Sequence, residues 1–165
     1  MRIEKEIPKS YIRNEQHKAL VNILFTANYI LERLKQILES KEITHQQYNI
    51  LRILKNSEKP LSTLKIREQM LDKMSDTSRI VERLLKKDLV NKQICSGDKR
   101  LVDVTISKKG IQLIEELDKK NSHIDGIICG LSPDDIDTLN LLLDKVREKK
   151  PTVSIGNAKL LPEKS

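Results

Sequence analysis

The spacing of the apolar residues changes from a helical to a strand period after Asp88, and that change restricts the fold more than any other feature. From residue 17 to residue 87 the apolar residues recur every three or four positions, which is the period of one face of an α-helix. Beyond Asp88 they alternate with polar residues, first over 90–94 and then over 102–106. Alternation predicts β-strands, and Ser96-Gly97-Asp98 between the two runs predicts a turn. We therefore expect a set of helices followed by one β-hairpin.

Helix periodicity and capping residues predict four helices before the hairpin and two after it. The expected helices cover about residues 17–40, 45–56, 61–71, 76–87, 108–128 and 133–146. Their predicted N-caps include Thr44, Ser75, Ser107 and Ser132, and Gln47 stands at the capping-box distance from Thr44. Residues 151–165 have no apolar period, so we expect a flexible tail there. The predicted fold class is mainly α with a small β-hairpin, an α+β arrangement in one domain.

Positive charge is concentrated in the middle of the chain. The net charge is +7, and residues 44–110 carry 15 Lys and Arg against 8 Asp and Glu. This excess favours a polyanionic partner. No apolar run is long enough to span a membrane, and residues 1–6 lack the apolar core of a signal peptide, so we expect a cytoplasmic protein with no membrane partner. Two cysteines cannot form a disulfide framework, which indicates a reducing compartment.

The fourth helix has one charged face and one apolar face. At 100° per residue, the charged face lies within about 60° of Arg79; it contains Ser75, Asp76, Arg79, Glu82, Arg83 and Lys86, with Ser78 near the same end. The opposite side contains Met74, Thr77, Val81, Leu84 and Leu85. The hairpin tip adds two adjacent cations, Lys99 and Arg100. Cations on both a helix and a turn suit contact with the grooves and phosphates of double-stranded DNA, although an ordinary solvated helix face is the commoner source of such a pattern.

The middle of the chain resembles a known protein family. The run from Thr44 to Gly110 resembles the MarR (multiple antibiotic resistance regulator) family of bacterial winged helix-turn-helix repressors. The matching pieces are Thr44-x-x-Gln47 with Leu51 and Leu54, Ser75-Asp76-Thr77-Ser78-Arg79-Ile80-Val81-Glu82-Arg83-Leu84, Leu89-Val90, Asp98-Lys99-Arg100 and Ser107-Lys108-Lys109-Gly110.

The resemblance implies a homodimer that binds a pseudo-palindromic DNA site and controls transcription. In that reading, residues 44–110 form the winged helix-turn-helix lobe that binds DNA, and 1–43 with 111–150 supply long dimerisation helices. The fourth helix enters the major groove, Arg100 enters the flanking minor groove, and Asp98 supports the wing. A small-molecule effector enters the cleft between the dimerisation helices and the lobe. The resemblance favours a repressor, although the residues themselves do not distinguish repressor from activator.

Three positions depart from the usual family pattern. Asp88 stands where the family has a glycine with positive φ, which Asp tolerates at a cost of about 1 kcal/mol. Asn91-Lys92 replaces an arginine, and Ile106-Ser107 replaces Leu-Thr while keeping a residue that can cap a helix.

Enzymatic and metal chemistry is not expected. His17, His45 and His123 are far apart, no Cys-x-x-Cys is present, and the five glycines are isolated, so we predict no enzyme, no metal and no cofactor.

Two alternatives to a DNA-binding regulator that responds to a small molecule stay open. One is a winged-helix module that binds protein instead of DNA, and the other is a redox-responsive regulator that acts through Cys95. Cys129 lies among apolar residues and is expected in the core.

Overall fold

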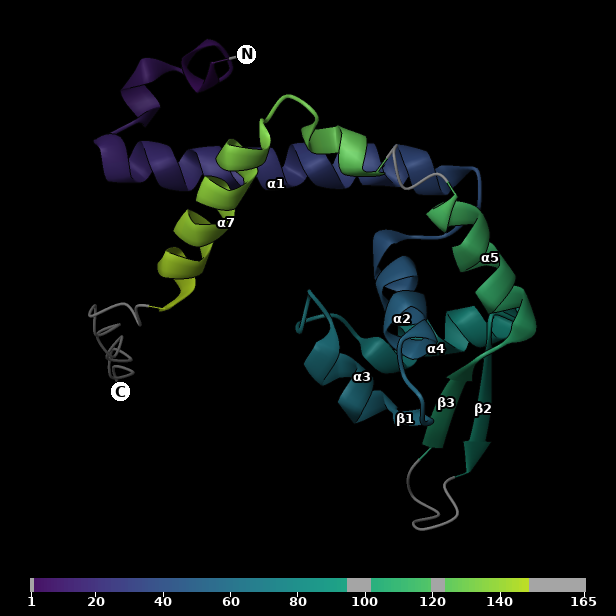
Figure 1. Ribbon diagram of the computed structural model, residues 1–165. Coiled ribbons are helices and arrows are strands. Elements are labelled where there is room, and N and C mark those ends of the chain that lie inside the picture. Colours follow the sequence, from purple (N-terminus) through teal and green to yellow (C-terminus); the bar gives the residue numbers. More distant parts are fainter. Residues whose placement is uncertain (1, 95–101, 120–123, 149–165) are drawn as a thin grey trace, which may run out of the picture. The chain divides into compact units, whose positions relative to one another are not determined.

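The computed structural model describes residues 2–94, 102–119 and 124–148. Over these ranges the chain is mainly helical with one three-stranded antiparallel sheet, which confirms the predicted fold class (Figure 1). The chain divides into two compact units, Met1–Ile127 and Ile128–Ser165, and each is described here by itself. No helix in the described residues is long and apolar enough to cross a membrane.

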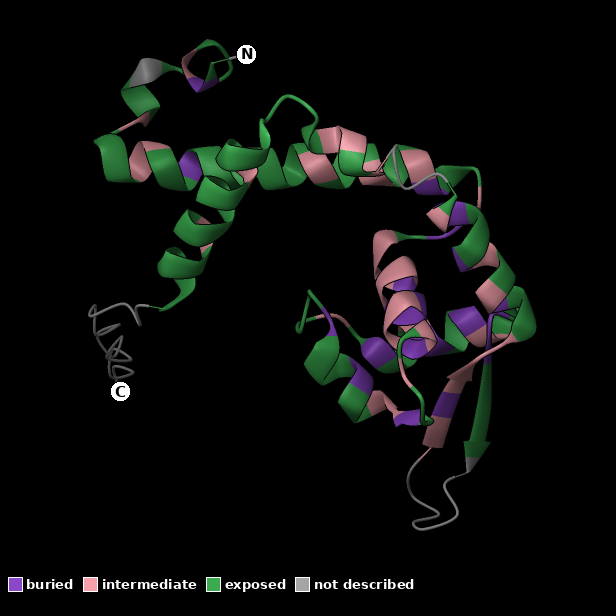
Figure 2. Cartoon of the chain, in the orientation of Figure 1, coloured by how far each residue is buried: buried purple, intermediate pink, exposed green. Residues whose placement is uncertain are grey.

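The first long helix, α1 (Glu15–Glu39), begins two residues earlier than the apolar stripe predicts. Its N-cap is Asn14, whose side chain accepts a hydrogen bond of 2.8 Å from the backbone N–H of His17. Two short 3-10 turns, Ile3–Lys5 and Lys9–Tyr11, precede it. Most of α1 is exposed in the single chain, whereas Leu38 near its end is fully buried (Figure 2).

The second helix, α2 (His45–Lys55), has the expected capping box. The Thr44 hydroxyl accepts from the Gln47 N–H at 3.3 Å, and the Gln47 side chain accepts from the Thr44 N–H at 3.1 Å. Because these bonds satisfy both residues, the Gln47 side chain is buried without an orphaned polar atom. Ile50, Leu51 and Leu54 form the buried face of α2.

The predicted helix over 61–71 is shorter than expected and starts later. Leu61–Ser62 form a strand, β1, and the helix, α3, covers Thr63–Gln69. Leu61 pairs with Val104 in the sheet and is buried there, so its apolar side chain belongs to a strand rather than to a helix face. The Ser62 hydroxyl then caps α3 by accepting from the Lys65 N–H. Leu71, the last residue of the predicted stripe, is 91% exposed.

The fourth helix, α4 (Thr77–Lys86), is capped by Asp76 and not by Ser75 as predicted. The Asp76 carboxylate accepts from the Arg79 N–H at 3.1 Å. Ser75 instead donates its hydroxyl to Asp72 at 2.5 Å within the preceding turn, and this bond is the first cause that lowers the pKa of the Asp72 carboxyl. Met74, expected on the apolar side, is 90% exposed because it precedes the helix.

The hairpin strands are β2 (Val90–Ile94) and β3 (Val102–Ile106), as the alternation predicts. Their register pairs Val90 with Ile106 and Lys92 with Val104, and the sheet order is β1-β3-β2. Two sequence predictions lie outside the described residues: the hairpin tip with Asp98, Lys99 and Arg100, and the candidate redox residue Cys95. β1, the third strand, was not predicted, because two residues are too few to show a period.

The buried core lies where α2, α3, α4, the sheet and α5 meet (Figure 2). Helix α5 covers Lys108–Asp118, and the Ser107 hydroxyl caps it by accepting from the Gly110 N–H at 3.0 Å. The predicted helix over 108–128 is therefore too long, and a separate 3-10 turn covers Gly126–Ile128. The apolar pattern did not reveal the end, because Leu117 and Ile124 are seven residues apart, or about two helical turns.

In the second unit, α7 (Pro133–Glu148) begins as predicted. Ser132 accepts from the Asp135 N–H at 3.2 Å, and the Asp135 carboxylate accepts from the Ser132 N–H at 3.1 Å. Cys129 is exposed, so its predicted place in the core is wrong for the single chain. It follows the 3-10 turn rather than lying on a regular amphipathic helix. The predicted tail, 151–165, lies outside the described residues.

Candidate nucleic-acid interface

Helix α4 presents cations on one side and is buried on the other. Thr77, Val81 and Leu84 are 4% exposed or less and pack into the core of the lobe. The side chains on the opposite side are exposed: Ser78, Arg79, Glu82, Arg83 and Lys86. Because the buried face fixes the rotation of the helix, the exposed face has a defined direction.

The turn after α4 joins this helix to the hairpin and to α5. Asp88 has a φ of 60°, which confirms that this position needs the left-handed region. The Ser107 hydroxyl donates to the Asp88 carbonyl at 2.6 Å, and the Ser107 N–H donates to the Leu89 carbonyl at 3.1 Å. Lys109 donates to the Lys87 carbonyl at 2.8 Å. The start of α5 is therefore bonded to three consecutive carbonyls of the turn, which holds the hairpin against α4.

Two basic residues near this turn bind backbone carbonyls of their own chain. Lys87 donates to the Glu42 carbonyl in the turn between α1 and α2, and Glu42 has a positive φ of 53°. Lys109 also lies 3.7 Å from the Asp88 carboxylate. These ammonium groups connect elements of the lobe, so they are weaker candidates for contact with a partner than the α4 cations.

An ion pair links α4 to the hairpin. Lys92 on β2 donates to Oε1 of Glu82 on α4. The Glu82 side chain is 49% exposed and the Lys92 side chain 32%, so both lie at the surface. Sequence reasoning placed Glu82 on the charged face but missed this pair, because the nine residues between its members have no fixed geometry until the hairpin forms.

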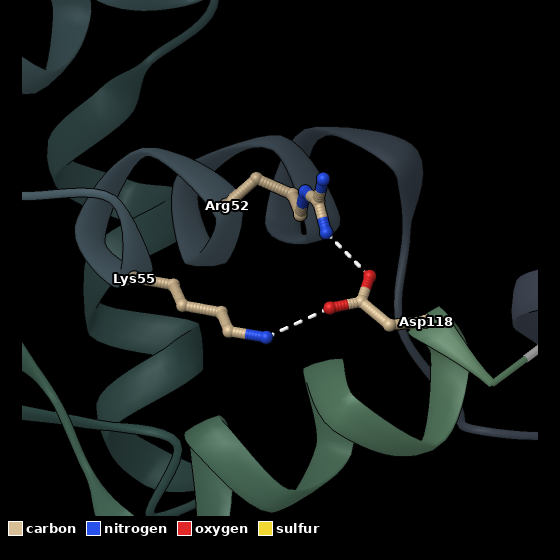
Figure 3. A network of polar contacts seen from close by, with 3 residues as sticks. All are labelled: Arg52, Lys55 and Asp118. Carbon is tan, nitrogen blue, oxygen red and sulfur yellow. Dashed lines mark hydrogen bonds and ion pairs between the residues drawn. The ribbon is translucent and has the colours of Figure 1, made fainter. Parts of the chain in front are cut away.

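A second network joins α2 to the last residue of α5 (Figure 3). Asp118 accepts from Lys55 at 2.7 Å and from Arg52 through its other oxygen. The hydrogen bond from Lys55 and the positive charge of Arg52 hold the pKa of the Asp118 carboxyl below its ordinary value, against the opposing effect of burial. Arg52 also lies over the Tyr48 ring, and burial raises the pKa of that phenol. Arg52 and Lys55 therefore link α2 to α5 inside one lobe, and they are weaker candidates for contact with a partner than the α4 cations.

An open cleft lies along α1 and the start of α2. Its volume is about 780 Å³. Two apolar side chains and several charged or polar groups form its walls: Asn28, Leu31, Glu32, Lys35, Glu39, Glu42, Ile43, Thr44, His45 and Gln46. The cleft is large enough for a drug-sized molecule.

The predicted site residues fall into three groups. Ser78, Arg79, Arg83 and Lys86 lie together on the exposed face of α4. Ser75 and Asp76 lie just before the helix and are engaged in local hydrogen bonds. Asp98, Lys99 and Arg100 lie outside the described residues. In the described part of the chain, no group of three or more His, Cys, Asp or Glu residues is arranged to hold a metal ion.

Comparison with known proteins identifies the lobe. Residues 43–102, which include α2, α3, α4 and β2, match the model of the MarR family. Over these residues the chain is similar to the MarR family. The resemblance found in the sequence is therefore confirmed for residues 43–102, and α3, α4 and the β2–β3 hairpin follow one another in the order of a winged helix-turn-helix.

Solved MarR-type structures have the same fold over most of the chain. A MarR-like transcription regulator from Bacillus cereus is 22% identical, with a TM-score of 0.73 over 81% of this chain and 96% of that one. A mutant MarR from E. coli in complex with operator DNA is 21% identical, with the same TM-score and coverage. BpsR from Bordetella bronchiseptica, whose DNA binding is regulated by 6-hydroxynicotinic acid, is 20% identical with a TM-score of 0.69 over 79% of this chain and 98% of that one. These similarities show the fold.

Proposed function

We propose that this chain is a sequence-specific DNA-binding transcription repressor that acts as a homodimer on a pseudo-palindromic operator. One observation carries the proposal. The buried face of α4 orients Arg79, Arg83 and Lys86 outward from a MarR-family lobe. An outward helix with cations on one face suits the major groove, where arginine pairs with guanine through two hydrogen bonds.

The wing completes the contact with DNA. Residues 95–101 connect β2 to β3, and in the proposed complex Arg100 enters the minor groove beside the major-groove site. Lys99 neutralises a phosphate, and Asp98 supports the wing. Ser78 adds a hydrogen-bonding group at the start of α4, beside Ser75 and Asp76. The bonds between Ser107 and the turn at 88–89 support this role, because they hold the hairpin strands against α4.

A second copy of the chain covers apolar side chains that the single chain leaves exposed. Along α1 these are Leu20, Ile23, Leu24, Phe25, Tyr29 and Leu31, each between 37% and 58% exposed. In the second unit, Leu141 and Val146 of α7 are more than 60% exposed. Apolar side chains gathered in this number are typical of an obligate interface. In this proposal residues 1–43 and 111–150 form the dimer and residues 44–110 bind DNA.

A small-molecule effector occupies the cleft along α1 and α2. The cleft lies beside both the proposed dimerisation helix α1 and the start of α2 in the lobe. Glu42, which lines the cleft, accepts a hydrogen bond through its backbone carbonyl from Lys87 at the end of α4. A ligand that moves this turn therefore alters the support of the helix that reads DNA. Compounds that raise the melting temperature of the wild type, but not that of a Gln46→Trp variant with a partly filled cleft, would support this site. Equal shifts in both proteins would exclude it.

DNA binding is tested by selecting a binding site from a random duplex library and measuring fluorescence anisotropy on it. Wild type should select a two-fold symmetric site. Arg79→Ala should bind this site more weakly, by about 1–3 kcal/mol per half-site if Arg79 contacts a base, and it should discriminate less between bases in the core of the DNA site. Lys119→Ala, an exposed cation at the end of α5, is the control and should bind like wild type. If the folded wild type selects no site and binds duplex DNA no better than Arg79→Ala, the alternative of a protein-interaction module is favoured.

A further inference from the structure

We propose that Glu82 is a specificity-determining residue on the DNA-reading face, and that Lys92 is the residue that positions it. This inference rests on the proposed DNA binding and adds the chemistry of one recognised base. Glu82 accepts a hydrogen bond from cytosine N4 in the major groove, so that one position in each half-site requires a C·G pair.

The carboxylate of Glu82 lies among the cations of α4. Glu82 lies three residues after Arg79 and directly before Arg83, on the exposed side of α4. It is the sole acidic residue of Thr77–Lys86, whereas Asp76 before the helix is engaged as the N-cap. The charged groups that surround it on α4 are donors only. A surface built solely to hold phosphates has no use for an acceptor at this place, because a carboxylate repels a polyanion.

The two oxygens of the Glu82 carboxylate differ in their hydrogen bonding. Lys92 reaches from β2 and donates to Oε1, and among the described residues no hydrogen bond to Oε2 is present, so this oxygen can accept from another donor. Because Lys92 stands on a strand paired with β3, its backbone is fixed and its ammonium limits the directions in which Glu82 can point. Both side chains of the pair are partly exposed, so a base edge can approach the carboxylate without displacing a buried side chain.

The Glu82–Lys92 pair lies beside a small hollow in the surface. Glu82 and Lys92 form part of the wall of a surface hollow of about 180 Å³ between α3, α4 and the hairpin. Three hydroxyl groups, those of Ser62, Thr63 and Ser78, line the same hollow. The carboxylate therefore stands beside open space at the junction of the helix and the wing, which is the side of α4 nearest to the hairpin strands.

The base class follows from hydrogen-bond chemistry. In the major groove cytosine presents an amino donor with no ring acceptor beside it, adenine presents an amino donor beside its N7 acceptor, and guanine and thymine present acceptors. A carboxylate accepts from cytosine, and it is repelled by the acceptors of guanine and thymine and by N7 of adenine, so the penalty for a wrong base includes repulsion as well as any lost bond. The cation of Lys92 reduces the repulsion between Glu82 and nearby phosphates, which makes the carboxylate tolerable in a DNA complex.

The test compares base preference in four proteins: wild type, Glu82→Ala, Lys92→Met and the control Glu115→Gln. Ala is a good helix former, and loss of an exposed ion pair costs at most about 1 kcal/mol, so the Ala variant should stay folded by circular dichroism. The control removes the same charge from an exposed position of α5. Each protein selects sites from the random duplex library, and anisotropy then measures binding to the selected site and to its single-base variants.

In wild type, one position per half-site should discriminate C·G from the other pairs by roughly fivefold to 150-fold. Glu82→Ala should lose this discrimination at that position alone, and its affinity for unrelated duplex DNA should rise because Lys92 is free to contact a phosphate. Lys92→Met should keep the preferred base but discriminate less well, and Glu115→Gln should match wild type.

Two outcomes would overturn the inference, and they can be told apart. If wild type selects a defined site and Glu82→Ala selects the same site with unchanged discrimination at every position, Glu82 reads no base while the proposed DNA binding stands. If wild type selects no site at all, the proposed function fails and the inference fails with it.

Discussion

The carbonyl oxygen of Leu89 lies 2.2 Å from the position that a Cβ atom on Gly110 would occupy. The same carbonyl accepts the N–H of Ser107, the cap of α5, so the first turn of α5 lies directly against the turn that follows α4. Only a residue without a side chain permits this approach. The turn after α4 and the first turn of α5 therefore meet at a point where an added methyl group does not fit.

Gly110→Ala should destabilise the lobe, because the added methyl group overlaps a backbone carbonyl that cannot move without breaking the Ser107 bond. The expected loss is about 1–3 kcal/mol in the free energy of unfolding, measured by urea denaturation at one protein concentration. Gly130→Ala is the matched control, since nothing described lies within 4 Å of its Cβ position. Equal unfolding midpoints for the two variants would contradict the close approach.

The Asp118 network predicts a stability contribution that depends on pH. The pKa of Asp118 is lower in the folded chain than its ordinary value of 3.8, chiefly through the Lys55 hydrogen bond. The folded state therefore binds fewer protons than the unfolded state in this range, so the contribution is present above about pH 4 and is lost as the pH falls through the folded pKa. Asp118→Asn should lower the free energy of unfolding by about 0.5–1 kcal/mol at pH 7.

The difference between wild type and Asp118→Asn should shrink as the pH is lowered from 7 to 3, and urea denaturation across that range measures it. Asp144→Asn on α7 is the control, because its pair with Arg147 is more than 60% exposed on both sides. It should change stability little at any pH. A difference for Asp118→Asn that stays constant down to pH 3 would show that the lowered pKa does not contribute to stability.

The proposed dimer depends on α1. Leu24 is 58% exposed in the single chain, so Leu24→Glu should leave the fold of each chain intact while placing a charge in the interface. Light scattering should give about twice the 19.1 kDa chain mass for wild type and a mass near one chain for the variant. Asn22→Glu places the same charge about 160° away around the helix and should remain dimeric. A monomeric wild type at micromolar concentration would exclude the dimer.

The proposed wing contact is tested at Arg100. Arg100→Ala should weaken DNA binding and reduce any preference for A·T-rich flanks, because narrow A·T-rich minor grooves attract arginine. The slope of log K against log salt should become shallower by about one unit per contact, or about two per dimer. Anisotropy titrations at several salt concentrations, on the selected site and on one with G·C flanks, measure both effects. An unchanged slope together with wild-type affinity would mean that the hairpin does not read DNA.

Local interactions explain where sequence reasoning succeeded. The capping box of Thr44 and Gln47, the start of α7 at Ser132-Pro133 and the positive φ of Asp88 each depend on residues within a few positions of one another. The two faces of α4 follow from helical geometry, so the order of residues along the chain is enough to place Arg79, Arg83 and Lys86 together. The alternation over 90–94 and 102–106 likewise predicted the hairpin strands.

Long-range contacts decided the rest. Leu61 became a strand residue because it pairs with Val104, more than forty positions away, and a two-residue strand has no pattern of its own. α5 ended at Asp118, where α2 supplies two cations. The change of cap at α4 is local instead, because the Ser75 hydroxyl bonds to Asp72 three residues before it. By itself the sequence determined the hairpin strands, the caps at Thr44, Ser107 and Ser132 and the charged face of α4, since these depend on neighbours along the chain. Only the tertiary structure decided the Glu82–Lys92 pair and the contact of Gly110 with Leu89, because both require residues that meet only after the lobe has folded.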